Sequence, residues 1–183
     1  MMARPKDYLV LSDTHGHERL LRRVASTINF RPAGILFLGD GLRDMEALSD
    51  IPSLRDIPLY AVSGNCDCFF SMRATEPLSR LLPLGSHKIY MTHGHQLGVR
   101  NGLDSAVQTA LAAGADVLLY GHTHVAHQQM LRTTDADGNE RYLLIANPGS
   151  LGEPRDGMSS RFGVLTLSDT EALFGHGQLG SAW

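Results

Sequence analysis

The chain has only two cysteines, and they stand one residue apart at Cys66 and Cys68. A disulfide between residues that close would be badly strained, so a disulfide framework is excluded and a reduced, cytoplasmic protein is expected. The chain does not need such a framework. With 183 residues, 43% of them hydrophobic, it is long enough to bury a core that folds without covalent support.

Long hydrophobic runs and an excess of basic charge are missing as well. The apolar run at residues 8–11 is too short for a signal-peptide core, and no stretch approaches the length of a membrane span. The net charge is −3, and the sequence has no basic stripe interleaved with aromatic residues. We therefore expect no membrane partner, find no strong nucleic-acid signature, and disfavour a nuclease.

Short apolar runs, each followed at once by glycine or polar residues, predict a sheet. Residues 8–12, 35–38 and 59–62 are typical of three strands joined by helical segments, the βαβ pattern of parallel pairing. The second half is richer in strands and hairpins, with turn signals at residues 85–86 and 135–139. Two sheets packed face to face, with helices outside, accommodate both halves.

The sequence shows no linker, no repeat and no low-complexity segment. We therefore expect a single domain over residues 1–183, with its core at about residues 7–170. Residues 162–167 form the last strand in this interpretation. Residues 175–183 are expected to be a frayed tail.

Nine histidines are the unusual feature of the composition. Imidazole binds metals and exchanges protons near neutral pH, so this number indicates a site. Five polar clusters each follow an apolar strand. They are Asp13-Thr14-His15, Gly39-Asp40, Gly64-Asn65-Cys66-Asp67, His93-Gly94-His95 and Gly121-His122-Thr123-His124. Ligands bind outside the carboxyl ends of strands in open α/β sheets, so we expect these clusters to converge on one edge.

The residue types in these clusters favour a transition metal. Aspartate and histidine with one asparagine make a mixed oxygen and nitrogen site, which suits Mn²⁺, Fe²⁺ or Zn²⁺ better than Ca²⁺. Any one cluster alone would be an ordinary turn or helix cap. Three carboxylates, from Asp13, Asp40 and Asp67, together with four or five imidazoles exceed what one tetrahedral ion can use. The number of donors predicts two metals that share a bridging carboxylate.

In this order the motifs resemble those of the calcineurin-like metallophosphoesterases, in particular the small YfcE-type phosphodiesterases. The matching stretches are Ser12-Asp13-Thr14-His15-Gly16, Leu38-Gly39-Asp40, Gly64-Asn65-Cys66-Asp67, Thr92-His93-Gly94-His95, Tyr120-Gly121-His122-Thr123-His124 and Asn147-Pro148-Gly149-Ser150. The resemblance implies an α/β (α+β) fold, a four-layer αββα sandwich of two mixed sheets flanked by helices. The last stretch is interpreted as a rigid turn beside the site.

The resemblance also implies a ligand set for two divalent ions per subunit. The matching positions are Asp13, His15 and His124 for the first metal, Asn65, His93 and His122 for the second, and Asp40 for the bridge. Mn²⁺ is the metal expected first, and Fe, Zn²⁺, Ni²⁺ and Co²⁺ are alternatives. His95 matches the motif without being a ligand in the family, and is expected to orient phosphate or a metal ligand.

The residues expected to act in catalysis are Asp40, Asn65, His93 and His95, with Cys66 and Asp67 as further candidates. Cys66 stands where many larger relatives have a histidine thought to protonate the leaving group. A thiol is a poor replacement, and a small buried filler is the alternative interpretation. Asp67 either hydrogen-bonds a ligand such as His93 or caps its loop.

The function expected from these features is hydrolysis of a small phosphate ester by a hydroxide that two metals share. A phosphodiesterase is favoured, and a phosphomonoesterase or nucleotidase is an alternative. A non-catalytic scaffold on the same fold, as in the retromer complex, is another, although fold alone does not decide activity. The small relatives often pair, so a homo-oligomer, either a dimer or a tetramer, is also considered.

Overall fold

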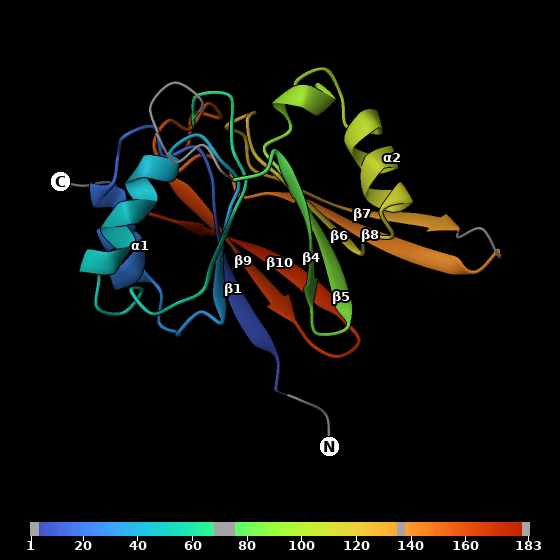
Figure 1. Cartoon of the computed structure of the whole chain (residues 1–183), viewed down its shortest axis with the longest axis horizontal. Helices are drawn as coiled ribbons and strands as arrows, with labels where there is room; N and C mark the ends of the chain where they lie inside the picture. Colours follow the sequence, from blue (N-terminus) through green and yellow to red (C-terminus); the bar gives the residue numbers. More distant parts are fainter. Residues whose placement is uncertain (1–3, 68–75, 135–137, 181–183) are drawn as a thin grey trace.

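Two five-stranded sheets form the centre of the molecule (Figure 1). The structure is a computed structural model that describes residues 4–67, 76–134 and 138–180. The strand order is β10-β9-β1-β2-β3 in the first sheet and β4-β5-β6-β8-β7 in the second. Among the helices of the described residues, none is long and apolar enough to cross a membrane.

The first sheet is parallel on one side of β1 and antiparallel on the other. Its strands are β1 (Lys6–Leu11), β2 (Gly34–Phe37), β3 (Leu59–Ala61), β9 (Arg161–Leu167) and β10 (Ala172–Gln178). Strands β1, β2 and β3 pair in parallel, whereas β9 pairs antiparallel with both β1 and β10. The sheet is therefore mixed, as expected.

The second sheet has a parallel centre and two antiparallel edges. Its strands are β4 (Ser79–Leu84), β5 (His87–Thr92), β6 (Val117–Tyr120), β7 (His127–Thr134) and β8 (Glu140–Asn147). Strands β5, β6 and β8 run parallel, and β4 and β7 complete the two hairpins predicted from the sequence. The expected turn at residues 135–139 lies partly outside the described residues.

Helices cover the outer face of each sheet, which makes four layers (Figure 1). α1 (Arg19–Thr27) and the 3₁₀ helix η1 (Leu42–Asp50) pack on the first sheet through one apolar cluster. α2 (Asp104–Ala112) packs on the second sheet, near the short 3₁₀ helix η3 (His95–Leu97). A third cluster lies between the sheets. The αββα sandwich expected from the sequence is confirmed.

The buried strands alternate between two apolar cores. In β1, Leu9 and Leu11 pack toward the helices, whereas Tyr8 and Val10 pack toward the second sheet. A strand that is covered on both faces needs apolar residues at every position, because successive side chains point to opposite faces. This explains why the strand appears in the sequence as a continuous apolar run.

The frayed tail expected at residues 175–183 is wrong for its first four residues, which belong to β10. This strand pairs antiparallel with β9, and its Phe174 is buried between the two sheets. Leu179 is also buried, in the cluster beneath α1, so the core extends beyond residue 170. Residues 162–167 are accordingly not the last strand, because β10 follows.

Glycines in β9 and β10 make room for aromatic rings from the neighbouring strand. A Cβ added at Gly163 would lie 2.3 Å from Cζ of Phe174, and one added at Gly177 would lie 2.2 Å from Cζ of Phe162. The rings thus cover glycine positions, and the burial of their apolar surface stabilises a strand whose glycines alone give low β-propensity. Because these glycines have low β-propensity, the sequence of β10 predicts a tail and not a strand.

Replacement of Gly163 by alanine should destabilise the protein by about 1–3 kcal/mol, because the buried Phe174 ring must move away from the new methyl group. Gly175→Ala is the matched control, since nothing lies within 4 Å of its added Cβ. Urea unfolding of both variants measures the difference. Equal stability of the two variants would contradict this packing.

Candidate metal centre

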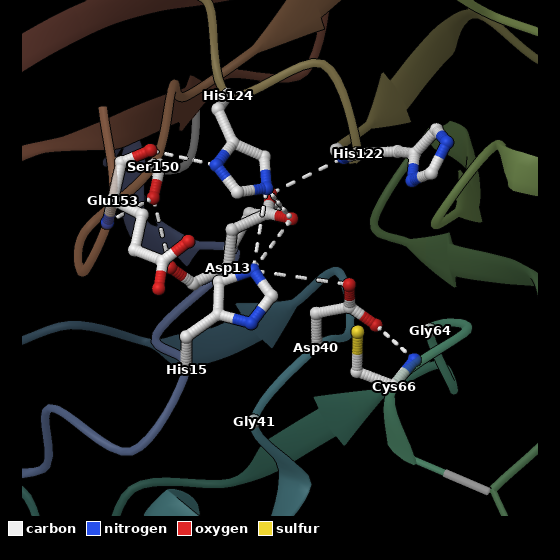
Figure 2. Close-up of polar contacts among 12 residues, drawn as sticks. Asp13, His15, Asp40, Gly41, Gly64, Cys66, His122, His124, Ser150 and Glu153 are labelled. Carbon is white, nitrogen blue, oxygen red and sulfur yellow. Dashed lines mark hydrogen bonds and ion pairs between the residues drawn. The ribbon is translucent and has the colours of Figure 1, made fainter. Parts of the chain in front are cut away.

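The parallel strands bring the five polar clusters to one region. The clusters follow β1, β2 and β3 of the first sheet and β5 and β6 of the second. Strands β1, β2 and β3 point the same way, as do β5 and β6, so each set delivers its loops to one edge. The convergence predicted from the sequence is found, and Figure 2 shows side chains from both sheets facing one another.

A left-handed backbone marks most of the predicted ligands. In the part of the chain that the structure describes, all non-glycine residues with positive φ belong to this set: Asp13 (54°), His15 (45°), Asp40 (59°), His122 (67°) and His124 (61°). Each such residue costs about 1–2 kcal/mol relative to an ordinary backbone. On an extended strand, side chains two residues apart, such as those of Asp13 and His15, would point the same way, but the backbone would continue straight past the site. The left-handed turns instead curl each loop around the centre.

The first group consists of Asp13, His15 and His124. The two histidine Nε2 atoms lie 3.2 Å apart. Oδ1 of Asp13 is 3.2 Å from Nε2 of His124 and 3.8 Å from Nε2 of His15. Asp13 is fully buried and His124 is nearly so.

The hydrogen bonds around this first group leave Nε2 of His124 and Oδ1 of Asp13 available to accept a bond or to bind a cation. Nδ1 of His124 donates to the carbonyl of Glu153 at 2.6 Å, so neutral His124 presents a bare Nε2. Oδ2 of Asp13 accepts from the hydroxyl of Ser12 at 2.5 Å and from the backbone of His122 at 3.2 Å. The other oxygen, Oδ1, is buried and has no hydrogen-bond partner among the described residues. Facing acceptor atoms of this kind fit a cation.

The second group consists of Asp40, His93 and His122. Nε2 of His93 lies 3.4 Å from Oδ2 of Asp40 and 3.1 Å from Nδ1 of His122. Nδ1 of His93 donates to the carbonyl of Leu38 at 2.7 Å, so its Nε2 also faces the centre. The donor atoms of each group lie within 4.8 Å of one another, and each group could hold a metal ion.

Asp40 connects the two groups. Its Oδ2 lies 3.9 Å from Nε2 of His15 in the first group and 3.4 Å from Nε2 of His93 in the second. Its Oδ1 accepts the backbone N–H of Cys66 at 2.7 Å (Figure 2). Burial opposes its ionisation, but hydrogen bonds and the nearby charge of His93 hold the pKa of the carboxyl well below its ordinary value. Asp40 therefore stays ionised between the groups.

Two buried carboxylates hold the loops that carry these groups. Asp67 accepts four backbone N–H groups at 2.7–2.8 Å, from Asp40, Gly41, Leu42 and Gly64. Of the two roles considered for Asp67 in the sequence, loop capping is the one that its contacts show. Because it binds the N–H of Asp40 itself, Asp67 fixes the residue that connects the groups.

The second of these carboxylates, Asp44, was missed by sequence reasoning. It accepts from the hydroxyl of Thr14 at 2.5 Å and from the backbone of Gly16 at 2.8 Å. Asp44 thereby ties the loop after β1 to the first turn of η1. Its only sequence signal is an aspartate four residues after Asp40, which is also typical of an ordinary acidic residue in a first helical turn.

The loops that carry Asp40 and Gly64 approach so closely that residue 64 must be glycine. A Cβ there would lie 2.0 Å from Oδ1 of Asp40 and 2.5 Å from its backbone nitrogen. The contact is with the connecting carboxylate itself, so no side chain fits without moving it.

Asn65, His95 and Cys66 lie at the rim of the two groups. The exposed Asn65 amide donates to Sγ of Cys66 at 3.3 Å, and it forms no hydrogen bond with a predicted metal ligand among the described residues. The His95 ring centroid lies 5.4 Å from that of His93, and its buried Nδ1 has no hydrogen-bond partner in the described part of the chain. Burial, then the hydrogen bond and charge of Asp40, raise the pKa of the Cys66 thiol to about 11.

The turn expected at residues 147–150 does lie beside the site. The buried Asn147 amide donates to the carbonyl of Gly121 and the hydroxyl of Thr123 at 3.0 and 3.1 Å. The Ser150 hydroxyl donates to the carbonyl of Asp13 at 2.9 Å (Figure 2). This turn therefore joins the loops that carry Asp13 and His124. The contributions of Ser12 and of the Glu153 carbonyl were missed, and a backbone carbonyl leaves no signal in a sequence.

A family model identifies the class of protein. The calcineurin-like phosphoesterase superfamily domain matches residues 7–170, which is most of the chain. The chain therefore belongs to the calcineurin-like phosphoesterase superfamily, as its motifs indicate.

Two relatives in this superfamily carry names that bear on function. The chain is 34% identical over 164 residues to the probable metallophosphoesterase YsnB of Bacillus subtilis, covering 90% of this chain and 86% of YsnB. It is 33% identical over 112 residues to the phosphodiesterase YfcE of Escherichia coli, covering 58% of this chain and 52% of YfcE.

Solved structures show the same fold. A protein of Streptococcus pneumoniae, described as a predicted phosphoesterase, matches with a TM-score of 0.72 at 23% identity, covering 96% of this chain and 91% of that one. Vacuolar protein sorting 29 of Cryptosporidium parvum matches with a TM-score of 0.60 at 18% identity, covering 98% and 100%. At these identities the likeness concerns the fold alone.

If the left-handed backbone at His15 is strained, glycine there should be better tolerated than alanine. Both substitutions remove the imidazole, but only glycine adopts φ of 45° at little cost. In chelated, metal-free protein we expect His15→Gly to be more stable than His15→Ala by about 1 kcal/mol in urea unfolding. The reverse order would show that this backbone relaxes to an ordinary conformation without its metal.

Proposed function

We propose that this chain is a metal-dependent phosphodiesterase that hydrolyses a small phosphate ester at a centre of two divalent ions, with Mn²⁺ as the preferred metal. The observation that carries the proposal is the pair of Asp–His groups that meet at Asp40, where carboxylate oxygens and imidazole nitrogens face one another at short distances. Membership of the superfamily and the 33% identity to YfcE support the choice of reaction.

The proposed ligands divide between the two ions as follows. Asp13, His15 and His124 hold the first ion, His93 and His122 hold the second, and Asp40 is shared. Asn65 is assigned to the second ion on the sequence resemblance, since its amide contacts Cys66 in this structure. The mixture of carboxylates and imidazoles suits Mn²⁺, Fe²⁺ or Zn²⁺.

The reaction follows from what each residue does around the phosphate. Bound ions of this type supply Lewis acidity, which lowers the pKa of water and stabilises negative charge on phosphoryl oxygens. The carbonyls of Leu38 and Glu153 fix the tautomers of His93 and His124, so both imidazoles remain ligands rather than acids. His95 lies beside His93 and His122, where its ring nitrogens can orient a phosphate oxygen.

The leaving group receives little help from an acid in this site. Cys66 stands at the position of the acid in larger relatives, but the high pKa of its thiol makes it a weak proton donor. An aryl oxide departs without a proton, whereas an alkoxide needs one. The site therefore suits phosphodiesters with good leaving groups, such as aryl or nucleotide-type esters.

Aryl phosphodiesters should be hydrolysed at least about 10²-fold faster than simple alkyl esters, the factor that a positioned general acid contributes. Steady-state kinetics of the metal-loaded enzyme on both classes at equal concentration measures the ratio. Cys66→His should lower the ratio of the aryl rate to the alkyl rate, because an imidazole can donate a proton to the leaving group. Cys66→Ser is the control. Equal rates for aryl and alkyl esters in the unaltered protein would remove this account of leaving-group dependence.

The alternative is a non-catalytic scaffold. We consider it because the chain shares its fold with vacuolar protein sorting 29. The seven predicted ligand positions all carry suitable side chains, and a scaffold has no need of strained, buried acceptor atoms. This supports the enzyme over the scaffold. A phosphomonoesterase differs only in substrate and is an outcome of the experiment below.

Asp40→Asn tests the proposed function, because it removes the shared negative charge while keeping the shape of the side chain. Protein loaded with Mn²⁺ should contain about two ions per chain and hydrolyse an aryl phosphodiester. In the variant we expect the bound metal to fall to one ion or fewer, and the activity to fall by about 10²–10³-fold or more.

Asp50→Asn is the matched control, since Asp50 is an exposed aspartate at the end of η1, and it should keep both metal and activity. Metal content is read by elemental analysis and activity by release of the aryl alcohol. Uptake of two ions without hydrolysis of any ester would favour the scaffold. Faster hydrolysis of monoesters than of diesters would favour the phosphomonoesterase.

A further inference from the structure

A cavity of about 410 Å³ opens beside the first metal group. It is lined by segments from four loops: His15 and Gly16, residues 40–44 without Leu42, Cys66 and Asp67, and Glu153. Its volume falls within the range of about 300–1,000 Å³ that is typical of small-molecule sites. A phosphoryl group held at the metal centre would occupy only one end, so the cavity has room for a further part of the substrate.

The charges on the cavity wall are uneven. Four of its side chains are carboxylates, Asp40, Asp44, Asp67 and Glu153, and one, Arg43, is permanently cationic. Asp67 is occupied by four backbone N–H groups, and Asp44 by the Thr14 hydroxyl and the N–H of Gly16. Asp67 and Asp44 therefore bind the loops that carry the site, and none of the four carboxylates forms an ion pair with Arg43 in the described part of the chain.

Arg43 is exposed in the first turn of η1 and forms no ion pair or hydrogen bond with any residue that the structure describes. The neighbouring N–H groups of Gly41 and Leu42 are already bound to Asp67. These two amides are therefore not available to an anion, and the guanidinium is the permanently cationic donor on this wall. A guanidinium presents five N–H donors in a planar fork that matches phosphate or carboxylate oxygens.

We propose that Arg43 binds a second anionic group of the substrate, a phosphate or carboxylate carried beyond the phosphodiester that is cleaved. This rests on the proposed function, because the scissile phosphate must lie at the metal centre for Arg43 to meet the rest of the molecule. The substrate class is then a phosphodiester with an additional phosphate or carboxylate. Arg43 is a specificity-determining residue that lowers KM for such esters.

Two matched pairs of aryl phosphodiesters test this proposal at two separations. One pair is ethyl nitrophenyl phosphate and its 2-phosphoethyl analogue, and the other is thymidine 5′-nitrophenyl phosphate with and without a 3′-phosphate. In the unaltered protein we expect kcat/KM to be about tenfold higher for the phosphorylated member of at least one pair, through KM, as one charge-assisted contact predicts.

Arg43→Gln should bring this ratio to about one, and Arg43→Lys should keep part of it because the charge remains. Arg31→Gln, at another exposed arginine outside the cavity, is the control and should keep the ratio of the unaltered protein. A ratio near one for both pairs in the unaltered protein overturns the proposal. So does a preference that Arg43→Gln leaves intact.

Equilibrium binding separates failure of this subsite from failure of the proposed function. Calorimetry with thymidine 3′,5′-bisphosphate and thymidine 5′-monophosphate, in the presence of Mn²⁺, should show tighter binding of the bisphosphate, lost in Arg43→Gln. That result without hydrolysis of any ester contradicts the proposed enzyme but supports the anion subsite. Hydrolysis with no Arg43-dependent preference in either binding or kinetics contradicts the subsite alone.

Discussion

The site depends on carboxylate oxygens and imidazole nitrogens that the fold brings within 4.8 Å of one another in each group. Nε2 of His15 and Nε2 of His124 lie 3.2 Å apart, and a buried carboxylate oxygen of Asp13 faces them without a hydrogen bond among the described residues. Such an arrangement is unfavourable in the absence of a cation or shared protons, because lone pairs in a buried setting lack both water and partners. A cation bound at this point would remove that unfavourable arrangement.

The rest of the structure maintains this arrangement. Two apolar cores hold the first sheet, and a third joins the second sheet to α2, so the strand ends are fixed before the loops begin. Asp67 and Asp44 then fasten the loops through backbone and hydroxyl donors, and the turn at residues 147–150 joins the loops of the two sheets. Each of these contacts opposes the relaxation that repulsion and left-handed backbone would otherwise cause.

Much of the fold and most of the centre could be predicted from the sequence. The strands of the core are continuous apolar runs, because both of their faces are buried, and the polar clusters follow them directly. The order of these clusters, more than any one of them, indicated the superfamily and the candidate metal centre. Local spacing was sufficient here because each ligand lies within a few residues of a strand end.

The remaining features depend on contacts that spacing does not encode. β10 contains two glycines, Gly175 and Gly177, and aromatic rings cover glycine positions across the β9–β10 pair. The roles of Asp44 and Asp67 arise from backbone amides brought from other loops, and the Glu153 carbonyl acts through the main chain alone. The place of Arg43 on the cavity wall likewise comes from the fold and not from local spacing.

The most direct measurement is a crystal structure of protein loaded with Mn²⁺, with anomalous scattering recorded at the manganese edge. The account predicts two peaks about 3.5–4 Å apart, one among Asp13, His15 and His124 and the other between His93 and His122, with Asp40 touching both. A single peak, or peaks that leave the Asp13 oxygen or the His93 nitrogen without a metal contact, would contradict it.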